Sequence, residues 1–223
     1  MLILTFCIVY LLYCIIPTFL YKIKHNLSNN RNAKNIYLTF DDGPDATYTN
    51  ELLDLLKDEN IKATFFVVAN SAKENKKVID RMIAEGHQIG LHSLEHKSAM
   101  VKGIRYTKND LCKSIEIMKE LNIPISYYRP PWGHINIATL CLVKKNNLKL
   151  VLWDVMTGDW KLNRTCADIK SSIINQTQNG DIICLHDARG SEGAPKKTIL
   201  ALTEAIPMLK SNYNFELLDK IYE

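Results

Sequence analysis

Residues 36–44 read IYLTFDDGP, an apolar run that ends in two adjacent aspartates and a Gly-Pro turn. A short apolar run bounded by turn residues is typical of a buried strand. Adjacent carboxylates repel each other, and a bound cation would offset that repulsion. Gly43 and Pro44 turn the chain, so Asp41 and Asp42 are expected at an exposed edge. The alternative is an Asx-type turn before a helix. We interpret the stretch as a buried strand with a polar site at its end.

The alternation of a short apolar run with a longer amphipathic stretch repeats along the rest of the chain. Strand-then-helix alternation predicts parallel strands joined by crossover helices. Further strands are expected at 63–68, 87–92, 126–128, 148–155, 181–186 and 214–218. Helices are expected at 48–59, 73–85, 108–121, 136–146, 165–175 and 196–210.

Polar residues gather at the carboxyl ends of these expected strands. In a closed barrel the strand ends meet at one mouth, where side chains from several strands can approach one another. An open doubly wound sheet forms its site mainly at a switch point and draws on fewer strands. The pattern therefore favours the barrel. The residues concerned are Asp41, Asp42, His92, Arg129, Asp154 and His186.

His92 and His96 are four residues apart, so on one helical turn both imidazoles could bind one cation. Alone, this spacing is also a common coincidence on a solvent-facing surface. Asp42 strengthens the metal interpretation because it lies at another strand end of the same expected mouth. One carboxylate and two imidazoles would leave a fourth position for water, as in catalytic zinc sites.

Five motifs follow one another along the chain: TFDDGP (39–44), HSLEH (92–96), RPPWG (129–133), WDVMTGDW (153–160) and LHD (185–187). In this order they resemble the polysaccharide deacetylase family, the NodB-homology domain of carbohydrate esterase family 4. The resemblance runs from about Ile36 to Glu223. It implies a distorted (β/α) barrel of about seven strands with the active site at the carboxyl-terminal mouth. It also implies hydrolysis of the N-acetyl groups of a polysaccharide, peptidoglycan-like or chitin-like, with release of acetate.

The resemblance implies roles for individual residues. Asp42, His92 and His96 match the ligands of a divalent metal ion; zinc is the first expectation, and cobalt or another divalent ion would suit the same ligands. Asp41 matches the catalytic base, and Arg129 resembles the residue that orients it.

The acid side of the expected reaction involves His186, which matches the residue that protonates the leaving amine. Asp159 resembles its carboxylate partner, but many relatives have a further Asp where this chain has Met156, so Asp154 is an alternative. The backbone N–H of Trp132 matches a donor to the oxyanion. Substrate contacts are expected from Pro131, Trp132, Trp160 and Leu185. Ordinary core packing is the alternative for the last two.

The first part of the chain differs in kind from the rest. Residues 1–21 carry no charged side chain and are about long enough to cross a bilayer as a helix. A cleaved signal peptide would have an early basic residue and a small-x-small cleavage site, and neither is visible. We expect a transmembrane anchor at 1–21, a polar linker at 22–34 and the catalytic domain at 35–223.

Two indications disagree about the side of the membrane on which the catalytic domain lies. A glycan substrate places the catalytic domain outside the cytoplasm, in an extracytoplasmic or periplasmic space. The basic residues that follow the anchor would hold that flank inside, by the positive-inside rule. They are Lys22, Lys24, Arg31 and Lys34.

Composition narrows the class of protein. With 47% hydrophobic and 23% charged residues, the chain is typical of a folded domain rather than a disordered one. The net charge is only +4, and scattered lysines without interleaved aromatics indicate no nucleic-acid binding. The six cysteines include no CxxC pair, which argues against a thiolate zinc site. Cys184, in an apolar run, is expected to be buried. Nothing indicates a protein partner.

Three functions are compatible with these motifs. The first is an N-deacetylase acting on N-acetylglucosamine or N-acetylmuramic acid units. The second is an O-acetyl esterase on acetylated xylan-like polymers, which the same family includes. The third is a non-catalytic glycan-binding protein that keeps the fold. A substitution at Asp41 or His186 would have favoured the third, and both are present.

Overall fold

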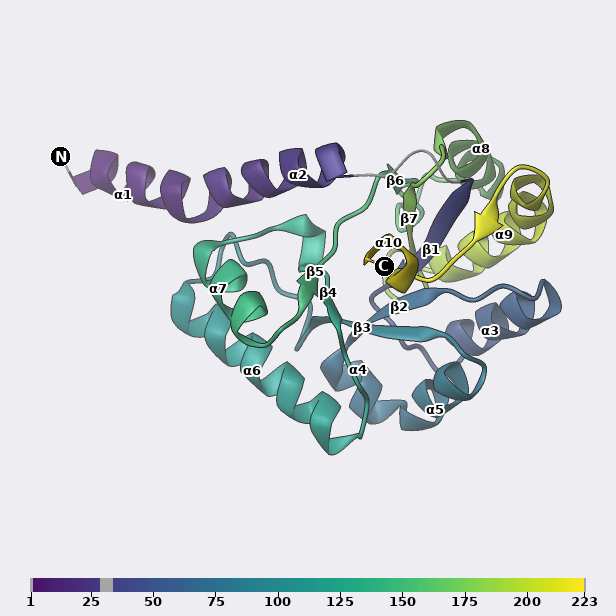
Figure 1. The fold of residues 1–223 in the computed structure, drawn as a ribbon, viewed down its shortest axis with the longest axis horizontal. Helices are drawn as coiled ribbons and strands as arrows, with labels where there is room; N and C mark the ends of the chain where they lie inside the picture. The colour runs from purple at the N-terminus through teal and green to yellow at the C-terminus, as the bar shows by residue number, and fades with distance from the viewer. Residues whose placement is uncertain (1, 29–33, 223) are drawn as a thin grey trace.

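One curled sheet of parallel strands forms the centre of the computed structural model, which describes residues 2–28 and 34–222 (Figure 1). The strands read as apolar runs because both faces of a parallel sheet are covered. They are β1 (Asn35–Asp41), β2 (Thr64–Val68), β3 (Gln88–Ser93), β4 (Tyr127–Tyr128), β5 (Lys149–Leu150), β6 (Val155–Met156), β7 (Ile182–His186) and β8 (Asn214–Phe215).

The strands pair in the order β5-β4-β3-β2-β1-β7-β6, and β8 pairs with the start of β1. The recorded pairs are all parallel, so the carboxyl ends of the strands face one mouth. At the end of β1, Asp41 lies opposite Phe66 of β2 on one side and His186 of β7 on the other. The sheet curls as a half-barrel, which confirms the expected distorted (β/α) barrel.

The stretch 148–155, expected as one strand, is instead two short strands at opposite edges of the sheet. Val151 N–H still donates to Tyr128 O over 2.9 Å, and Asp154 N–H donates to Ile182 O over 2.9 Å. Within these few residues the chain leaves β4 and joins β7, crossing the gap between the two edges. An apolar run carries no mark of where it changes its pairing partner. Within the described residues the sheet has seven strands in its main order and β8 beside the start of β1, in agreement with the expected barrel of about seven strands.

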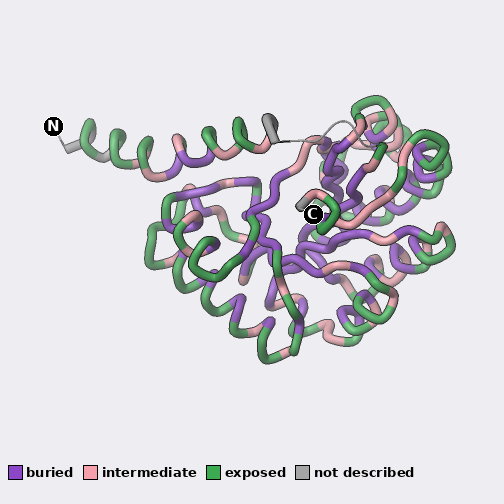
Figure 2. Tube along the Cα trace, in the orientation of Figure 1, coloured by how far each residue is buried: buried purple, intermediate pink, exposed green. Residues whose placement is uncertain are grey.

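Helices connect the strands and cover the outside of the sheet (Figure 1). They follow the expected amphipathic stretches, except that 73–85 forms parts of two helices separated at Asn75. The helices are α3 (Tyr48–Asp58), α4 (Ala69–Glu74), α5 (Lys76–Ala84), α6 (Ile104–Glu120), α7 (Ile137–Lys145), α8 (Cys166–Gln176), α9 (Ala194–Lys210) and α10 (Asp219–Tyr222). Their inner faces are buried and their outer faces exposed, as the coloured trace shows (Figure 2).

Neighbouring residues of β2 pack on opposite faces of the sheet, as strand geometry requires. Phe65 is buried among the residues of the larger core and stacks on Phe40, with ring centroids 5.2 Å apart. Phe66 faces the other side, where the Arg129 guanidinium lies 4.0 Å from its ring centroid. Gly90 on β3 gives this ring its space, because a Cβ there would lie 2.6 Å from Phe66 Cδ1. The inside of the curled sheet thus contains the buried guanidinium group of Arg129.

A long helix precedes the sheet and consists of α1 (Leu2–Tyr10), a π-helical turn η1 (Leu11–Ile15) and α2 (Ile16–Ser28). Its residues Cys7–His25 are long and apolar enough to cross a membrane. Proline at position 17 has no N–H for the carbonyl of residue 13, which fits the widened turn just before it. The helix continues to Ser28, so the first part of the expected 22–34 linker is helical. Residues 29–33 of that linker lie outside the described residues.

The second half of this helix lies along the domain (Figure 1). Cys14, Pro17 and Thr18 are buried, and Tyr21 OH donates to Leu150 O over 2.6 Å. The described side chains of α1 are mostly exposed, as the green trace shows (Figure 2). The apolar helix therefore has a docked half and an exposed half.

Candidate active site

A cavity of about 360 Å³ opens at the carboxyl ends of the strands. Side chains from the ends of β1, β3 and β7 meet there with side chains from the loops that follow other strands, as expected for a barrel mouth. The lining residues are Asp41, Asp42, His92, His96, Trp132, Trp153, Met156, Trp160, His186, Arg189 and Gly190.

Asp42, His92 and His96 converge at one side of this cavity, with their possible ligand atoms all within 4.8 Å of one another. Asp42 Oδ1 lies 3.3 Å from His92 Nε2 and 3.0 Å from His96 Nε2. Ligand atoms bonded to one tetrahedral zinc ion lie about 3.3 Å apart. The spacing of the three side chains therefore suits a cation.

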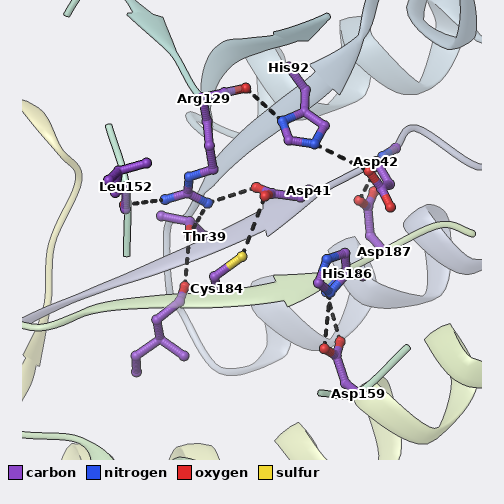
Figure 3. Close-up of polar contacts among 12 residues, drawn as sticks. Thr39, Asp41, Asp42, His92, Arg129, Leu152, Asp159, Cys184, His186 and Asp187 are labelled. Carbon is purple, nitrogen blue, oxygen red and sulfur yellow. Dashed lines mark hydrogen bonds and ion pairs between the residues drawn. The ribbon is translucent and has the colours of Figure 1, made fainter. Parts of the chain in front are cut away.

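The hydrogen bonds of His92 show which of its nitrogens is free to bind. Its Nδ1 lies 2.8 Å from Arg129 O, a carbonyl that can only accept, so Nδ1 carries the proton (Figure 3). When the ring is neutral, Nε2 carries a lone pair that faces a carboxylate oxygen of Asp42, and the two atoms repel unless a cation lies between them; when Nε2 carries a proton, it can donate to Asp42 instead. Asp42 Oδ1 is buried, and among the described residues the groups that face it are the two imidazole nitrogens, with no other donor bonded to it. These observations fit a divalent cation, with the Arg129 carbonyl fixing the histidine ligand from behind.

Asp42 remains a carboxylate in this environment. Burial alone would raise the pKa of Asp42, but the imidazoles of His92 and His96 outweigh it and hold that pKa below its usual range. Asp42 is therefore a carboxylate at neutral pH and can serve as an anionic ligand.

The two histidines do not lie on one helical turn, which corrects the expectation from their spacing. His92 belongs to β3, and His96 lies in the loop that follows. His96 N–H donates to Ser93 Oγ over 2.7 Å, and this turn brings the rings to 5.1 Å between centroids. His96 and Asp42 have φ values of 60° and 79°. Such left-handed backbone costs a non-glycine residue about 1–2 kcal/mol and is common at functional sites.

Asp41 forms an ion pair with Arg129, whose side chain is fully buried, over 2.7 Å from Nη1 to Oδ1 (Figure 3). The guanidinium also donates to Thr39 Oγ1 over 2.8 Å and to Leu152 O over 3.0 Å. Asp41 Oδ2 accepts from the Cys184 thiol, with 3.4 Å between Sγ and Oδ2. All six cysteines are free, and Cys184 is buried as expected. Arg129 therefore holds Asp41 from the buried interior of the sheet and does not itself line the cavity.

His186 lies beside Asp41, its register partner across β1 and β7. A nitrogen of its ring, a carboxylate oxygen of Asp41 and Cys184 Sγ are all within 4.8 Å of one another. His186 Nδ1 is 3.0 Å from Asp159 Oδ1, and its backbone N–H donates to Asp159 Oδ2 over 2.8 Å (Figure 3). Burial alone would lower the pKa of His186, but the Asp159 carboxylate outweighs it and raises the pKa to about 9. The ring is therefore a cation at neutral pH.

Asp159 rather than Asp154 is the carboxylate beside His186. Asp154 lies on the crossing segment, where its Oδ2 accepts from Ile182 N–H over 2.9 Å and its Oδ1 lies 3.4 Å from His25 Nε2. Sequence spacing could not separate the two aspartates, because both lie in the same motif and the crossing segment between the sheet edges was not foreseen.

The residues expected to contact substrate divide into two groups. Trp132, with 51% of its surface exposed, and Trp160, whose ring meets the His186 ring edge-on at 4.9 Å, line the cavity. Leu185 and Pro131 are buried and do not line the cavity in this structure, which for Leu185 agrees with the alternative of core packing; their contact with substrate stays a prediction. Leu185 faces the core because successive residues of β7 point to opposite faces and His186 takes the cavity side.

Several functional neighbours were not predicted from the sequence. Trp153 and Met156 line the cavity, and both belong to the WDVMTGDW motif, so that motif could have indicated them. Arg189 and Gly190 also line it, and no pattern marked them. Hydrogen bonds that connect loops cannot be read from spacing, and the role of Asp187 is the clearest case.

Asp187, the last residue of LHD, holds the turn after β1. Its Oδ1 accepts from Gly43 N–H over 3.1 Å, and its Oδ2 accepts from Thr49 Oγ1 over 2.6 Å. A Cβ on Gly43 would lie 2.1 Å from Asp187 Oδ2, so only glycine fits at that position. Burial raises the pKa of Asp187 to about 7. The TFDDGP and LHD motifs are thus two sides of one packed contact.

Comparison with known proteins agrees with this geometry. The family model of polysaccharide deacetylases matches residues 28–151. A peptidoglycan-N-acetylglucosamine deacetylase of Bacillus cereus is 33% identical over 187 residues, 82% of this chain and 86% of the relative. The crystal structure of the Bc1960 peptidoglycan N-acetylglucosamine deacetylase has a TM-score of 0.80 at 30% identity, covering 86% of this chain and 90% of that one.

A fourth comparison limits what the fold alone can show. The structure of a protein from Bacillus anthracis, described as a pseudoenzyme of carbohydrate esterase family 4, has a TM-score of 0.78. It is 21% identical, covers 87% of this chain and 67% of that one, and shares the fold alone. The family model and the B. cereus relative carry the assignment: this chain belongs to the polysaccharide deacetylase family.

Proposed function

We propose that this chain is a metal-dependent N-deacetylase that hydrolyses the N-acetyl amide of sugar units in a glycan and releases acetate. The observation that carries the proposal is the pairing of Asp41 with His186 beside three potential metal ligands in one cavity. The relatives described as peptidoglycan-N-acetylglucosamine deacetylases make peptidoglycan the first substrate to test. Because a pseudoenzyme shares the fold, the argument rests on these side chains rather than on the barrel.

Asp42, His92 and His96 would hold the divalent cation. When bound, it would polarise the amide carbonyl and acidify a water molecule. One carboxylate and two imidazoles suit zinc, which we propose first, and also cobalt and several other divalent ions.

Asp41 is the proposed base. Its carboxylate accepts a proton from the attacking water, whose oxygen forms a bond to the amide carbon. Arg129 keeps Asp41 at the edge of the cavity through the 2.7 Å ion pair. Negative charge then develops on the former carbonyl oxygen, and the proposed backbone donor to it is Trp132 N–H, from the loop on the His96 side of the cavity.

His186 is the proposed acid. It gives a proton to the amide nitrogen as the carbon–nitrogen bond breaks, so the products are acetate and a free amine on the sugar. An amine leaves poorly unless it is protonated, and a pKa of about 9 keeps His186 charged at neutral pH. Because Asp159 engages Nδ1, the other ring nitrogen, Nε2, is the donor.

We also propose that residues 1–21 attach the chain to a membrane and that residues 35–223 form the catalytic domain outside the cytoplasm. The apolar helix Cys7–His25 supports the attachment. A peptidoglycan substrate supports the outer location, since that polymer lies outside the cytoplasmic membrane.

The test is acetate release by the full chain in detergent. N-acetylglucosamine oligomers, peptidoglycan and acetylated xylan are supplied in parallel, after chelation and again after zinc or cobalt is returned. Metal-dependent acetate from an N-acetylated glycan is the expected result. Acetate from xylan alone would replace the proposal with an O-acetyl esterase. Bound metal without acetate from any substrate would favour a glycan-binding role.

A further inference from the structure

Thr18 of α2 makes two hydrogen bonds to one residue of the loop that follows β4. Its hydroxyl donates to Ile135 O over 2.7 Å, and Ile135 N–H donates to Thr18 Oγ1 over 2.9 Å. Both residues are buried. A helical threonine commonly bonds back to a carbonyl one turn earlier, but this one satisfies the backbone of a segment far along the chain. Without it, a buried N–H and a buried carbonyl of Ile135 would lose their partner.

Further contacts lie on the same face of the N-terminal helix. Cys14 Sγ lies 3.7 Å from Met100 O, one turn before Thr18. Tyr21 OH, one turn after Thr18, donates to Leu150 O over 2.6 Å. Positions 14, 18 and 21 share a face because residues three and four apart are neighbours on a helix. The helix is therefore docked in a defined register by polar contacts, which a merely apolar association would not require.

The loop that Thr18 holds carries strained backbone. Trp132 and Gly133 have φ values of 55° and 64°, two consecutive residues in the left-handed region. Tryptophan has a Cβ, so it keeps this conformation only where the surrounding structure fixes the chain on both sides. On the amino-terminal side the loop is fixed by Arg129, through its ion pair with Asp41. On the carboxyl-terminal side it is fixed at Ile135, by Thr18.

Tyr21 extends the contact to a second segment of the mouth. Its acceptor, Leu150, ends β5 and leads into the crossing segment. There Leu152 O accepts from the Arg129 guanidinium and Trp153 lines the cavity. The N-terminal helix thus contacts two segments that also carry residues of the cavity wall, Trp132 and Trp153.

From these contacts we infer that Thr18 is a positioning residue of the active site, which holds the 130–136 loop and with it Trp132. The docked half of the N-terminal helix, from Cys14 to Tyr21, is then part of the catalytic unit, and its exposed first half is the part left for the proposed attachment to a membrane. The kinetic consequence rests on the proposed deacetylase function, whereas the hold on the loop does not.

The experiment uses the full chain in detergent with three substitutions. Thr18→Val removes the hydroxyl at nearly constant shape, and Thr18→Ser keeps it. Thr203→Val controls for the loss of a helical threonine hydroxyl away from the docked face, because this exposed threonine of α9 donates within its own helix, to Ile199 O over 3.1 Å. For each protein, kcat and KM are measured on an N-acetylglucosamine oligomer, and amide hydrogen exchange is measured by mass spectrometry.

For Thr18→Val we expect kcat to fall by about tenfold or more with little change in KM, because a displaced donor affects the transition state most. Exchange should rise in peptides that cover 130–137, and Thr18→Ser should restore both quantities. Thr203→Val should match the unsubstituted chain. Unchanged kcat and exchange in Thr18→Val would overturn the inference, and so would a uniform rise in exchange over the whole sheet. If the unsubstituted chain releases no acetate, the proposed function fails, and the exchange comparison alone decides whether Thr18 holds the loop.

Discussion

Arg129 contacts the proposed base with its side chain and the potential metal site with its backbone. Its Nη1 lies 2.7 Å from Asp41 Oδ1, and the two side chains are 0% and 4% exposed. Its carbonyl oxygen lies 2.8 Å from His92 Nδ1 and so sets which ring nitrogen faces Asp42. One residue therefore couples the two halves of the site. A change at Arg129 is expected to affect both.

Two substitutions of Arg129 distinguish the effect of its charge from the effect of its hydrogen-bonding geometry. Arg129→Met leaves the Asp41 carboxylate buried without a cation, and we expect the free energy of unfolding to fall by about 3–5 kcal/mol. Arg129→Lys keeps the charge but cannot donate to Asp41, Thr39 and Leu152 together, so it should lose less stability and still lose most activity. Urea denaturation and acetate release measure the two effects. A Lys variant with the full rate would show that the guanidinium fork is not needed.

Substitutions at the two adjacent aspartates should have different effects on metal content. Asp41→Asn removes the proposed base and leaves the ligand set, so we expect full metal content and a rate lower by about 10²–10⁴-fold. Asp42→Asn removes an anionic ligand, and metal content should fall with the rate. Metal content is measured by elemental analysis after dialysis. Metal loss from Asp41→Asn would mean that the division of labour between the two is wrong.

Much of the site could be predicted because its residues end strands. Asp41, His92 and His186 each close an apolar run, and the ends of parallel strands necessarily meet at one edge. Sequence order and strand pattern were therefore enough to bring these residues to the same mouth.

Other features depend on contacts that no local pattern encodes. The segment between β5 and β6 changes partner inside one apolar run, and Leu185 faces away from the cavity because the register of β7 points His186 toward it. Thr18 is an ordinary polar residue in an apolar helix until the fold places Ile135 beside it. Packing between distant segments sets these roles, so the sequence alone could not show them.

The His186–Asp159 pair predicts a pH dependence. The pKa of about 9 belongs to the metal-free chain, and a bound cation nearby would lower it, so the rate should fall at a pH of about 9 or below, where the acid loses its proton. Asp159→Asn removes the main cause that raises this pKa and leaves burial, which lowers it, so the alkaline limb should move to lower pH. Profiles of kcat against pH check this, and an unmoved limb would exclude His186 as the group responsible.

The same pair bears on stability. The pKa of His186 is raised above its ordinary value of 6.5, so its contribution to stability is fully present below pH 6.5 and is lost as the pH rises through about 9. Melting temperatures of the metal-free chain should decline over this window. In Asp159→Asn the decline should be smaller, and an equal decline in both proteins would contradict the assignment.

His186→Ala should discriminate between substrates by their leaving groups. An amine must be protonated as it leaves, whereas the alkoxide or phenoxide of an activated acetyl ester leaves more readily without an acid. We expect the rate on N-acetylglucosamine oligomers to fall much further than the rate on 4-nitrophenyl acetate. Equal losses on both would argue against a role for His186 in protonating the leaving amine.

The contact between Gly43 and Asp187 predicts a double-substitution result. A Cβ on Gly43 would lie 2.1 Å from Asp187 Oδ2, so Gly43→Ala must displace that carboxylate and should cost about 1–3 kcal/mol by overpacking. Asp187→Ala removes the acceptor of Gly43 N–H and Thr49 Oγ1 and should also destabilise the fold. In the double variant the carboxylate that the new Cβ would meet is absent. The double variant should therefore lose less unfolding free energy than the sum of the losses in the two single variants. Urea denaturation of the four proteins measures this coupling. Additive losses would show that the two residues do not depend on each other, and the packed contact between the TFDDGP and LHD motifs would then not explain why glycine is required at position 43.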